Sequence, residues 1–299
     1  MSISTEKYIN PFTDFGFKKL FGTEMNKDLL MDFLNELIYN QGKIKEVKYI
    51  NPEQLGRSED DRRAVFDIYC ETETGERFIV EMQKANLNFF KDRSVYYASF
   101  PIREQGLKGD WDYSLKAVYT VGILNFVFNE SKDDKSYYHS EVKLMDTKKK
   151  TVFYDKLTFI YLEMPKFSKS IEQLETRFEK WMYVLKNLPK LQELPPQLQE
   201  RIFEKIFRVA EIAGMNKQEI LEYEDSLKKY RDLYSALDTA EKKGITEGIT
   251  EGIKKGKIEG KIEIAKRLLE KGMSIEEICD VTALPEKLLL SHMQQYLSL

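Results

Sequence analysis

The stretch that decides the fold is AVFDIYCETETGERFIVEMQ, at positions 64–83. Apolar and polar residues alternate in its two halves, and the polar run ETETGE separates them, which predicts a β-hairpin. Successive side chains of a strand point to opposite faces, so a shift of one residue would pair polar with apolar positions throughout. The matched register sets Cys70 opposite Phe78 and Asp67 opposite Glu81, and the Cβ atoms of an opposed pair lie about 5 Å apart. Phe66 is expected to share the face of Cys70.

Two opposed carboxylates need a physical explanation, because like charges directly across a hairpin are destabilising. A divalent cation between Asp67 and Glu81 removes that repulsion, and proteins usually hold Mg²⁺ with one or two carboxylates, water and substrate phosphate. Gln83 lies on the same face as Glu81, and its amide could orient the water that such an ion activates. The alternative is a solvent-exposed sheet face with ordinary charges, which antiparallel sheets commonly have.

Helical and strand patterns surround this hairpin. Apolar residues recur with helical spacing over 26–38, and a helix after the hairpin is expected to end before Pro101. Further strands are predicted at 115–128 and 151–164, with the lysine-rich segment 131–150 as a polar connection between them. After these strands the pattern is almost wholly helical. The sequence therefore predicts an α/β core followed by an α-helical extension.

The segments are expected to follow these changes of pattern. We place the core at 1–168, the helical extension at 169–240, and a glycine-repeat helix with a helix-turn-helix-like tail at 241–299. The tail either reads DNA or forms a small helical dimer or cap.

Five glycines recur at intervals of four residues near the start of this tail: Gly244, Gly248, Gly252, Gly256 and Gly260. Each glycine in a helix costs about 1 kcal/mol relative to alanine, so a lone helix of this composition is poorly stabilised. A ridge of small residues would let a partner helix approach closely, which favours homodimerisation through the tail. The other interpretation is a flexible spacer.

Composition excludes several classes of protein. The chain has 299 residues with 47 basic and 50 acidic side chains, so any nucleic-acid surface has to be a local patch. The densest basic cluster of the core contains 148–150, and it is either such a patch or a solvated loop. The two cysteines indicate no disulfide framework, and the two histidines provide no zinc or Ser-His-Asp set. No signal-peptide pattern or membrane-length apolar run is present, so we expect a cytoplasmic protein without membrane contact.

Several blocks of the sequence carry a family resemblance: NPFTDFGFKKLFG at 10–22, LLMDFLNELI at 29–38, the hairpin with its ending EMQKA, and RSVYYAS at 93–99. Together they closely resemble the PD-(D/E)XK nuclease family transposases, also called recombination-promoting nucleases. Asp67 with Glu81 and Gln83 matches the D…(D/E)-x-K signature of that superfamily, with glutamine in place of lysine. The resemblance implies a restriction-endonuclease-like core, and the glutamine form is common in this family.

The resemblance also implies roles for individual residues. Asp67 and Glu81 are expected to bind Mg²⁺, and Gln83 is expected to position or polarise the attacking water. Asp14 matches an N-terminal acidic position of the family and is expected to be a further catalytic carboxylate; the alternative is that it only caps the first helix. On the helix after the hairpin, Arg93 could contact a phosphate, and the neighbouring tyrosines are more simply explained by packing.

These observations together predict a Mg²⁺-dependent DNA endonuclease linked to DNA recombination or mobile elements. Its reaction would be hydrolysis of a phosphodiester bond by water that the ion activates. The main alternative is a non-enzymatic DNA- or protein-binding module that keeps a degenerate nuclease fold.

Overall fold

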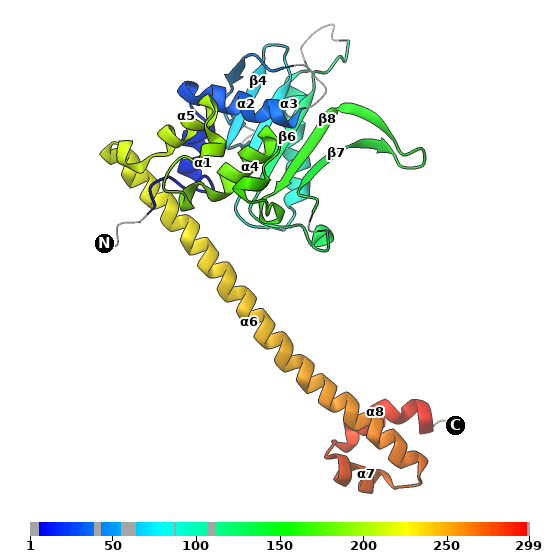
Figure 1. The fold of residues 1–299 in the computed structure, drawn as a ribbon. Helices are drawn as coiled ribbons and strands as arrows, with labels where there is room; N and C mark the ends of the chain where they lie inside the picture. The colour runs from blue at the N-terminus through cyan, green and yellow to red at the C-terminus, as the bar shows by residue number, and fades with distance from the viewer. Residues whose placement is uncertain are drawn as a thin grey trace. The chain divides into compact units, whose positions relative to one another are not determined.

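The structure is a computed structural model that describes residues 6–38, 43–54, 64–86, 88–106, 112–134 and 136–297 (Figure 1). The chain forms two structural units, Met1–Tyr230 and Arg231–Leu299. The predicted segment boundaries at 168 and 240 stay predictions. Within the described ranges, no helix combines the length and apolar character that crossing a membrane requires.

A mixed sheet of six strands forms the centre of the first unit, in the order β1-β4-β5-β6-β8-β7. The strands β5, β6 and β8 are parallel, and the outer pairs are antiparallel. A second, two-stranded sheet pairs β2 with β3. The strand bounds are β1 Val47–Tyr49, β2 Glu53–Gln54, β3 Ala64–Val65, β4 Ile68–Thr72, β5 Arg77–Gln83, β6 Val118–Leu124, β7 His139–Asp146 and β8 Thr151–Glu163.

Helices cover both faces of the sheet (Figure 1). One face packs in a large hydrophobic cluster with side chains of α1, α2, α4, α5 and the start of α6, while α3 covers the other face. This arrangement confirms the predicted α/β, restriction-endonuclease-like core with its C-terminal helical region. The helix bounds are α1 Asp14–Phe21, α2 Lys27–Leu37, α3 Phe90–Glu104, α4 Arg177–Asn187, α5 Arg201–Ala210, α6 Lys217–Glu270, α7 Ile275–Thr282 and α8 Glu286–Leu297.

The predicted hairpin register is confirmed, with one exception at its open end. Strands β4 and β5 pair with Cys70 opposite Phe78, as the alternation requires. The predicted face of Phe66 is wrong, because the first strand is interrupted between β3 and β4 and Phe66 is turned over. It packs with Tyr69 and Phe100 on the α3 side rather than with Cys70. An aromatic side chain that finds a complete apolar pocket outweighs the simple alternation of the strand.

Helix α3 continues beyond the predicted stop at Pro101 and ends at Glu104. Contacts of its last turn explain the extension: the Tyr69 hydroxyl donates to Glu104 Oε2 at 2.5 Å, and Arg77 forms an ion pair with the same carboxylate. Phe100 is also fully buried against the sheet. Tertiary contacts therefore compensate for the backbone hydrogen bond that a proline removes from a helix.

The lysine-rich connection predicted at 131–150 contains a strand, β7, so this part of the prediction is wrong. Strand β7 is hard to detect because both of its faces are largely exposed, and it lacks an apolar alternation. Only the part of β8 from Leu157 onward pairs with β6, so the first residues of β8 and the end of β7, from Leu144 onward, form a two-stranded ribbon. The exposed lysines 148–150 lie on its turn, where the Asp146 carboxylate accepts from the backbone N–H groups of Lys148 and Lys149.

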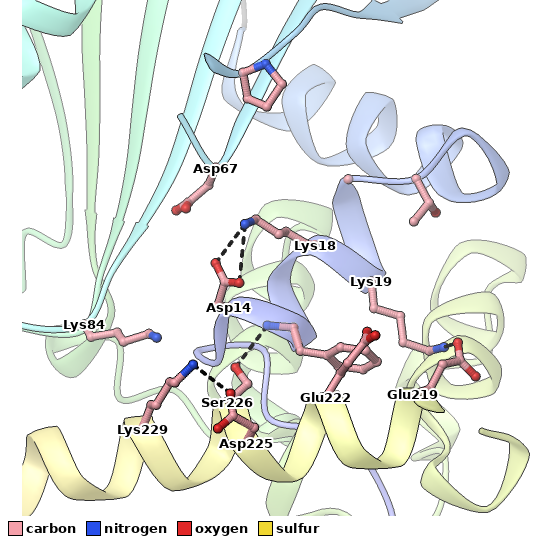
Figure 2. A pocket seen from close by; sticks show the side chains of 14 residues that line it. Asp14, Lys18, Lys19, Asp67, Lys84, Glu219, Glu222, Asp225, Ser226 and Lys229 are labelled. Atoms are coloured by element: carbon pink, nitrogen blue, oxygen red, sulfur yellow. Dashed lines mark hydrogen bonds and ion pairs between the residues drawn. The ribbon is translucent and has the colours of Figure 1, made fainter. Parts of the chain in front are cut away.

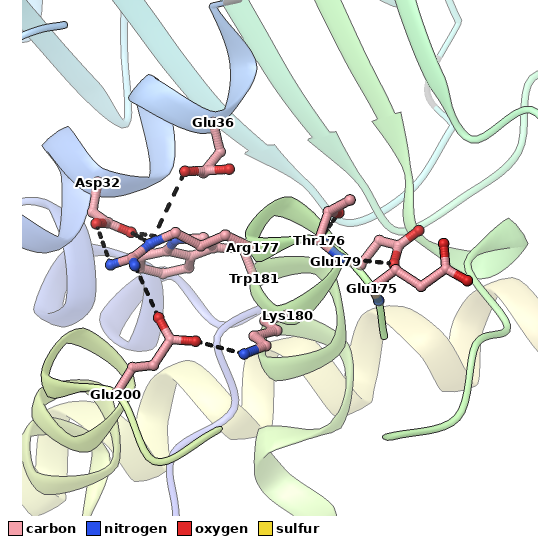
Figure 3. A network of polar contacts seen from close by, with 9 residues as sticks. All are labelled: Asp32, Glu36, Glu175, Thr176, Arg177, Glu179, Lys180, Trp181 and Glu200. Atoms are coloured by element: carbon pink, nitrogen blue, oxygen red, sulfur yellow. Dashed lines mark hydrogen bonds and ion pairs between the residues drawn. The ribbon is translucent and has the colours of Figure 1, made fainter. Parts of the chain in front are cut away.

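A polar network fixes α4 against α2 (Figure 3). Thr176 and Glu179 form a capping box at the start of α4. The Asp32 carboxylate of α2 accepts from the Arg177 guanidinium at 2.7 and 3.0 Å and from the Trp181 indole N–H at 2.8 Å. Since the Trp181 side chain is almost completely buried, this acceptor satisfies a donor that would be costly to leave unpaired.

The second unit has its own small hydrophobic cluster, formed by the end of α6, α7 and α8. Ser274 and Glu277 form a capping box at the start of α7, and Gly272 has a positive φ of 85° at the end of α6. The glycine repeat lies inside α6, where a Cβ at any of the five positions would meet no atom within 4 Å. The repeat is therefore helical, with open space around every one of its glycines.

Candidate active site

The two carboxylates of the hairpin lie where its regular pairing ends. The ladder between β4 and β5 stops at Ile68–Val80; Glu81 is the next residue of β5, and Asp67 immediately precedes β4. There the Asp67 backbone N–H donates to Glu81 Oε1 at 3.1 Å, and the Met82 backbone N–H donates to Asp67 Oδ2 at 2.8 Å. Each carboxylate is thus held by the opposite strand, and each uses one oxygen for this purpose.

Burial and mutual repulsion disfavour the charged forms of this pair. Burial raises the pKa of Glu81 to about 8, and the nearby charge of Asp67 acts in the same direction. Burial also raises the pKa of Asp67, against the opposing effect of the hydrogen bond from Met82, and Asp14 adds a further like charge. Without a cation, the pair therefore tends to retain a proton near neutral pH.

This donor set fits the requirements of Mg²⁺. Within the described ranges, no group of three or more His, Cys, Asp and Glu side chains is arranged to hold a metal ion. Magnesium, however, usually binds proteins through one or two carboxylates and completes its octahedron with water and substrate phosphates. Asp67 and Glu81 supply two such oxygen donors, and a cation would remove the repulsion that raises their pKa values.

An open pocket with a volume of about 950 Å³ lies beside Asp67 (Figure 2). Its lining comes from α1 and the two residues after it, from Pro52 and Asp67, from Lys84 just after β5, and from the first turns of α6. The Ser226 hydroxyl accepts from the Phe15 backbone N–H at 3.1 Å, and the Tyr223 hydroxyl accepts from that of Asn10 at 3.0 Å, so α6 is tied to α1.

Asp14 lies in this pocket, on the exposed first turn of α1. The alternative that it caps the helix is wrong, because Thr13 is the N-cap and its hydroxyl accepts from the Gly16 backbone N–H at 3.0 Å. The Asp14 carboxylate forms an ion pair with Lys18 at 3.1 Å. Its charge also contributes to the raised pKa of Asp67, so the fold brings the two carboxylates into one electrostatic environment.

Four lysines that the sequence patterns did not single out also line the pocket: Lys18, Lys19, Lys84 and Lys229. The charge of Lys18 lowers the pKa of both Asp67 and Glu81, which opposes the effect of burial. The spacing of Asp14 and Lys18, four residues apart on a helix, is a signal that could have indicated this pair. No sequence pattern indicates the contribution of α6.

Gln83 lies under α3 rather than in open solvent. The Arg93 guanidinium donates a hydrogen bond to Gln83 Oε1, and Gln83 Nε2 donates a long hydrogen bond of 3.4 Å to the Ala85 carbonyl. The expected packing of this helix on the sheet is confirmed for Tyr97, whose ring lies 5.2 Å from that of Phe66. It is wrong for Tyr96, which is exposed and contacts Phe100 of the same helix.

Comparison with known proteins identifies one family. A family model described as PD-(D/E)XK nuclease family transposase matches residues 11–240 of the 299-residue chain. The matched range includes α1, the hairpin, α3 and the part of α6 that lines the pocket. Among curated proteins and among solved structures, none matches this chain.

Proposed function

Because the chain belongs to the PD-(D/E)XK nuclease family transposases, a family of nucleases linked to mobile elements, we propose that it is a Mg²⁺-dependent DNA endonuclease. The observation that carries this proposal is the pair formed by Asp67 and Glu81, held across the hairpin next to a wide pocket. The reaction is hydrolysis of a phosphodiester bond, in the context of DNA recombination or mobile elements.

Each residue of the site has a role that its position supports. Asp67 and Glu81 would hold Mg²⁺, which when bound supplies a Lewis acid that lowers the pKa of water and neutralises charge on the phosphate. Gln83 orients the attacking water through its amide. Asp14 is proposed as a further catalytic carboxylate, because it faces the same pocket and interacts electrostatically with Asp67.

The balance of the reaction is simple. The oxygen of a water molecule forms a bond to phosphorus, and the bond from phosphorus to one sugar oxygen breaks. One proton of the water goes to solvent, and the departing sugar oxygen gains a proton. Lys18 and Lys84 line the pocket, and their positive charges would attract the phosphate groups of the substrate.

Supercoiled plasmid incubated with the full chain tests the proposal. We expect nicking or linearisation with Mg²⁺ and none with chelator. Asp67→Asn and Glu81→Gln should each reduce the rate at least about 100-fold, because each removes a charged oxygen donor. Asp155→Asn and Glu141→Gln, at exposed positions of β8 and β7, are matched controls that should cleave like the wild type. DNA binding without any Mg²⁺-dependent cleavage would instead support the non-enzymatic binding module.

Homodimerisation through the C-terminal tail is a second part of the proposal. Three isoleucines of the glycine repeat support it, because Ile245, Ile249 and Ile253 are each more than half exposed on a helix of low intrinsic stability. A cytoplasmic setting also belongs to the proposal, since both Cys70 and Cys279 are free thiols.

A further inference from the structure

The proposed site lacks the positive charge that a lysine would provide at position 83, and the contacts of Gln83 suggest what replaces it. The commoner form of the motif has lysine at this position, and lysine combines a positive charge with hydrogen-bond donors on one atom. Glutamine has donors but no charge. A nuclease with glutamine here therefore needs another source of positive charge next to Glu81.

Arg93 lies at the right place to be that source. Its guanidinium donates to Gln83 Oε1, and Gln83 is two residues from Glu81 on the same strand. The guanidinium is also held over two rings of its own helix, 5.7 Å from the centre of the Phe90 ring and 5.8 Å from that of Tyr97. These residues are three and four positions away, on the same side of α3, so the guanidinium is oriented before any ligand arrives.

This contact also limits what Gln83 can do. Since Arg93 occupies the amide oxygen, Gln83 is poorly placed to accept a proton from water. An amide nitrogen has two N–H donors, and the hydrogen bond to the Ala85 carbonyl uses only one of them. A guanidinium on the oxygen withdraws electrons from the amide and makes its remaining N–H a better donor.

We propose that Arg93 and Gln83 together replace the lysine of the commoner motif: Arg93 supplies the fixed positive charge, and Gln83 transmits it through its second N–H to the attacking water oxygen. Arg93 is thus a positioning residue. This inference rests on the proposed nuclease function, and it assigns the source of charge at the same site.

A double-mutant cycle between the two positions tests the pair. Arg93→Met keeps a long apolar side chain between the two rings and removes the charge, so kcat for plasmid nicking should fall about 10- to 100-fold with little change in KM. Gln83→Lys alone brings two cations into contact and should also lower kcat. In Gln83→Lys/Arg93→Met the lysine should supply both charge and donor, and kcat should recover to within a few-fold of the wild type.

Magnesium affinity in the absence of DNA gives a second readout, measured from the thermal shift of the full chain during a Mg²⁺ titration. Removing a cation next to Glu81 should tighten Mg²⁺ binding by about 3- to 10-fold in Arg93→Met, and adding one should weaken it by a similar factor in Gln83→Lys. The double variant should return to the wild-type affinity. A residue that only packs α3 on the sheet would not improve metal affinity when it is replaced.

The possible outcomes separate this inference from the proposed function. Additive effects on kcat without recovery, or weaker Mg²⁺ binding in Arg93→Met, would overturn the role of Arg93 while leaving the nuclease proposal in place. If no variant nicks DNA and the wild type does not either, the nuclease proposal fails. In that case, tighter Mg²⁺ binding in Arg93→Met and weaker binding in Gln83→Lys would still establish Arg93 as the positive charge at this site. Unchanged Mg²⁺ affinity in both variants would overturn that role of Arg93.

Discussion

At the residue scale, two opposing effects act on the pKa of the Glu81 carboxyl. It accepts a backbone N–H from Asp67, which stabilises its charged form, yet burial and the Asp67 charge raise its pKa to about 8. The desolvation effect is the larger one. In the metal-free protein, ionisation of the Glu81 carboxyl therefore lowers the free energy of unfolding.

The first prediction concerns pH. Because folding raises the pKa of Glu81 above its ordinary value of 4.5, its contribution to stability is complete below that pH and is lost as pH rises through about 8. In chelator, the free energy of unfolding of the wild type should fall as the pH rises from 4.5 to about 8. We expect a fall of at least about 1 kcal/mol, because each unit by which folding raises a pKa is worth about that much. Thermal unfolding at a series of pH values measures this fall.

Two comparisons make this prediction specific. Glu81→Gln removes the titrating group and should flatten the pH dependence over the same window, whereas Glu141→Gln at an exposed position of β7 should leave it unchanged. Saturating Mg²⁺ should also stabilise the wild type most at the high-pH end, since the ion competes with the proton. An equal pH dependence in wild type and Glu81→Gln would show that another group is responsible.

At the scale of elements, the junction between α2 and α4 depends on one acceptor. Asp32 holds both the Arg177 guanidinium and the Trp181 indole N–H, so it links the helix after the last strand to the N-terminal part of the core. Arg177 is 39% exposed, and solvent screens its ion pair. The loss of Asp32 should cost more at the indole N–H, because the Trp181 side chain is buried and an unsatisfied buried donor carries the full desolvation penalty.

The second prediction follows from this difference. Asp32→Ala should lower the free energy of unfolding by about 2–3 kcal/mol, the cost of leaving a buried donor unsatisfied. Glu36→Ala is the matched control on the same helix: its carboxylate lies 4.0 Å from Arg177 Nε, and its loss should cost less than about 1 kcal/mol. Urea unfolding of the three proteins measures both values. Equal losses would mean that the charge on α2, rather than the indole contact, stabilises the junction.

At the scale of the whole molecule, the two structural units have separate hydrophobic clusters. The third prediction uses this separation: deleting 241–299 should leave the core folded and active on plasmid, because the cluster around the sheet ends at Tyr230. If the tail mediates dimerisation, light scattering should show the mass fall from a dimer of the full chain to a monomer of the shorter one.

Replacing all five glycines of the repeat by alanine distinguishes a dimer ridge from a spacer. Open space surrounds every position, so each alanine should stabilise the helix by about 1 kcal/mol. A partner helix that packs on the ridge would be pushed away by the added methyl groups, and the dimer should weaken. A full-length chain that is monomeric before and after these changes would remove the dimer hypothesis.

Local patterns were sufficient for the hairpin, its register and the approach of Asp67 to Glu81. The physical reason is that strand alternation has a period of two, and only one set of pairings matches polar and apolar faces across a tight turn. The α/β class follows from the same kind of evidence, since periodicity along the chain distinguishes strands from helices.

The other features of the fold and the site depend on contacts between separate segments, which short-range sequence patterns do not predict. Phe66 turned over to reach Phe100, and the last turn of α3 continued past Pro101 to reach Tyr69. The wall of the pocket provided by α6 depends on hydrogen bonds between residues more than 200 positions apart. Arg93 meets Gln83 only because α3 crosses back over the sheet, and this crossing brings a positive charge to a motif that has no lysine.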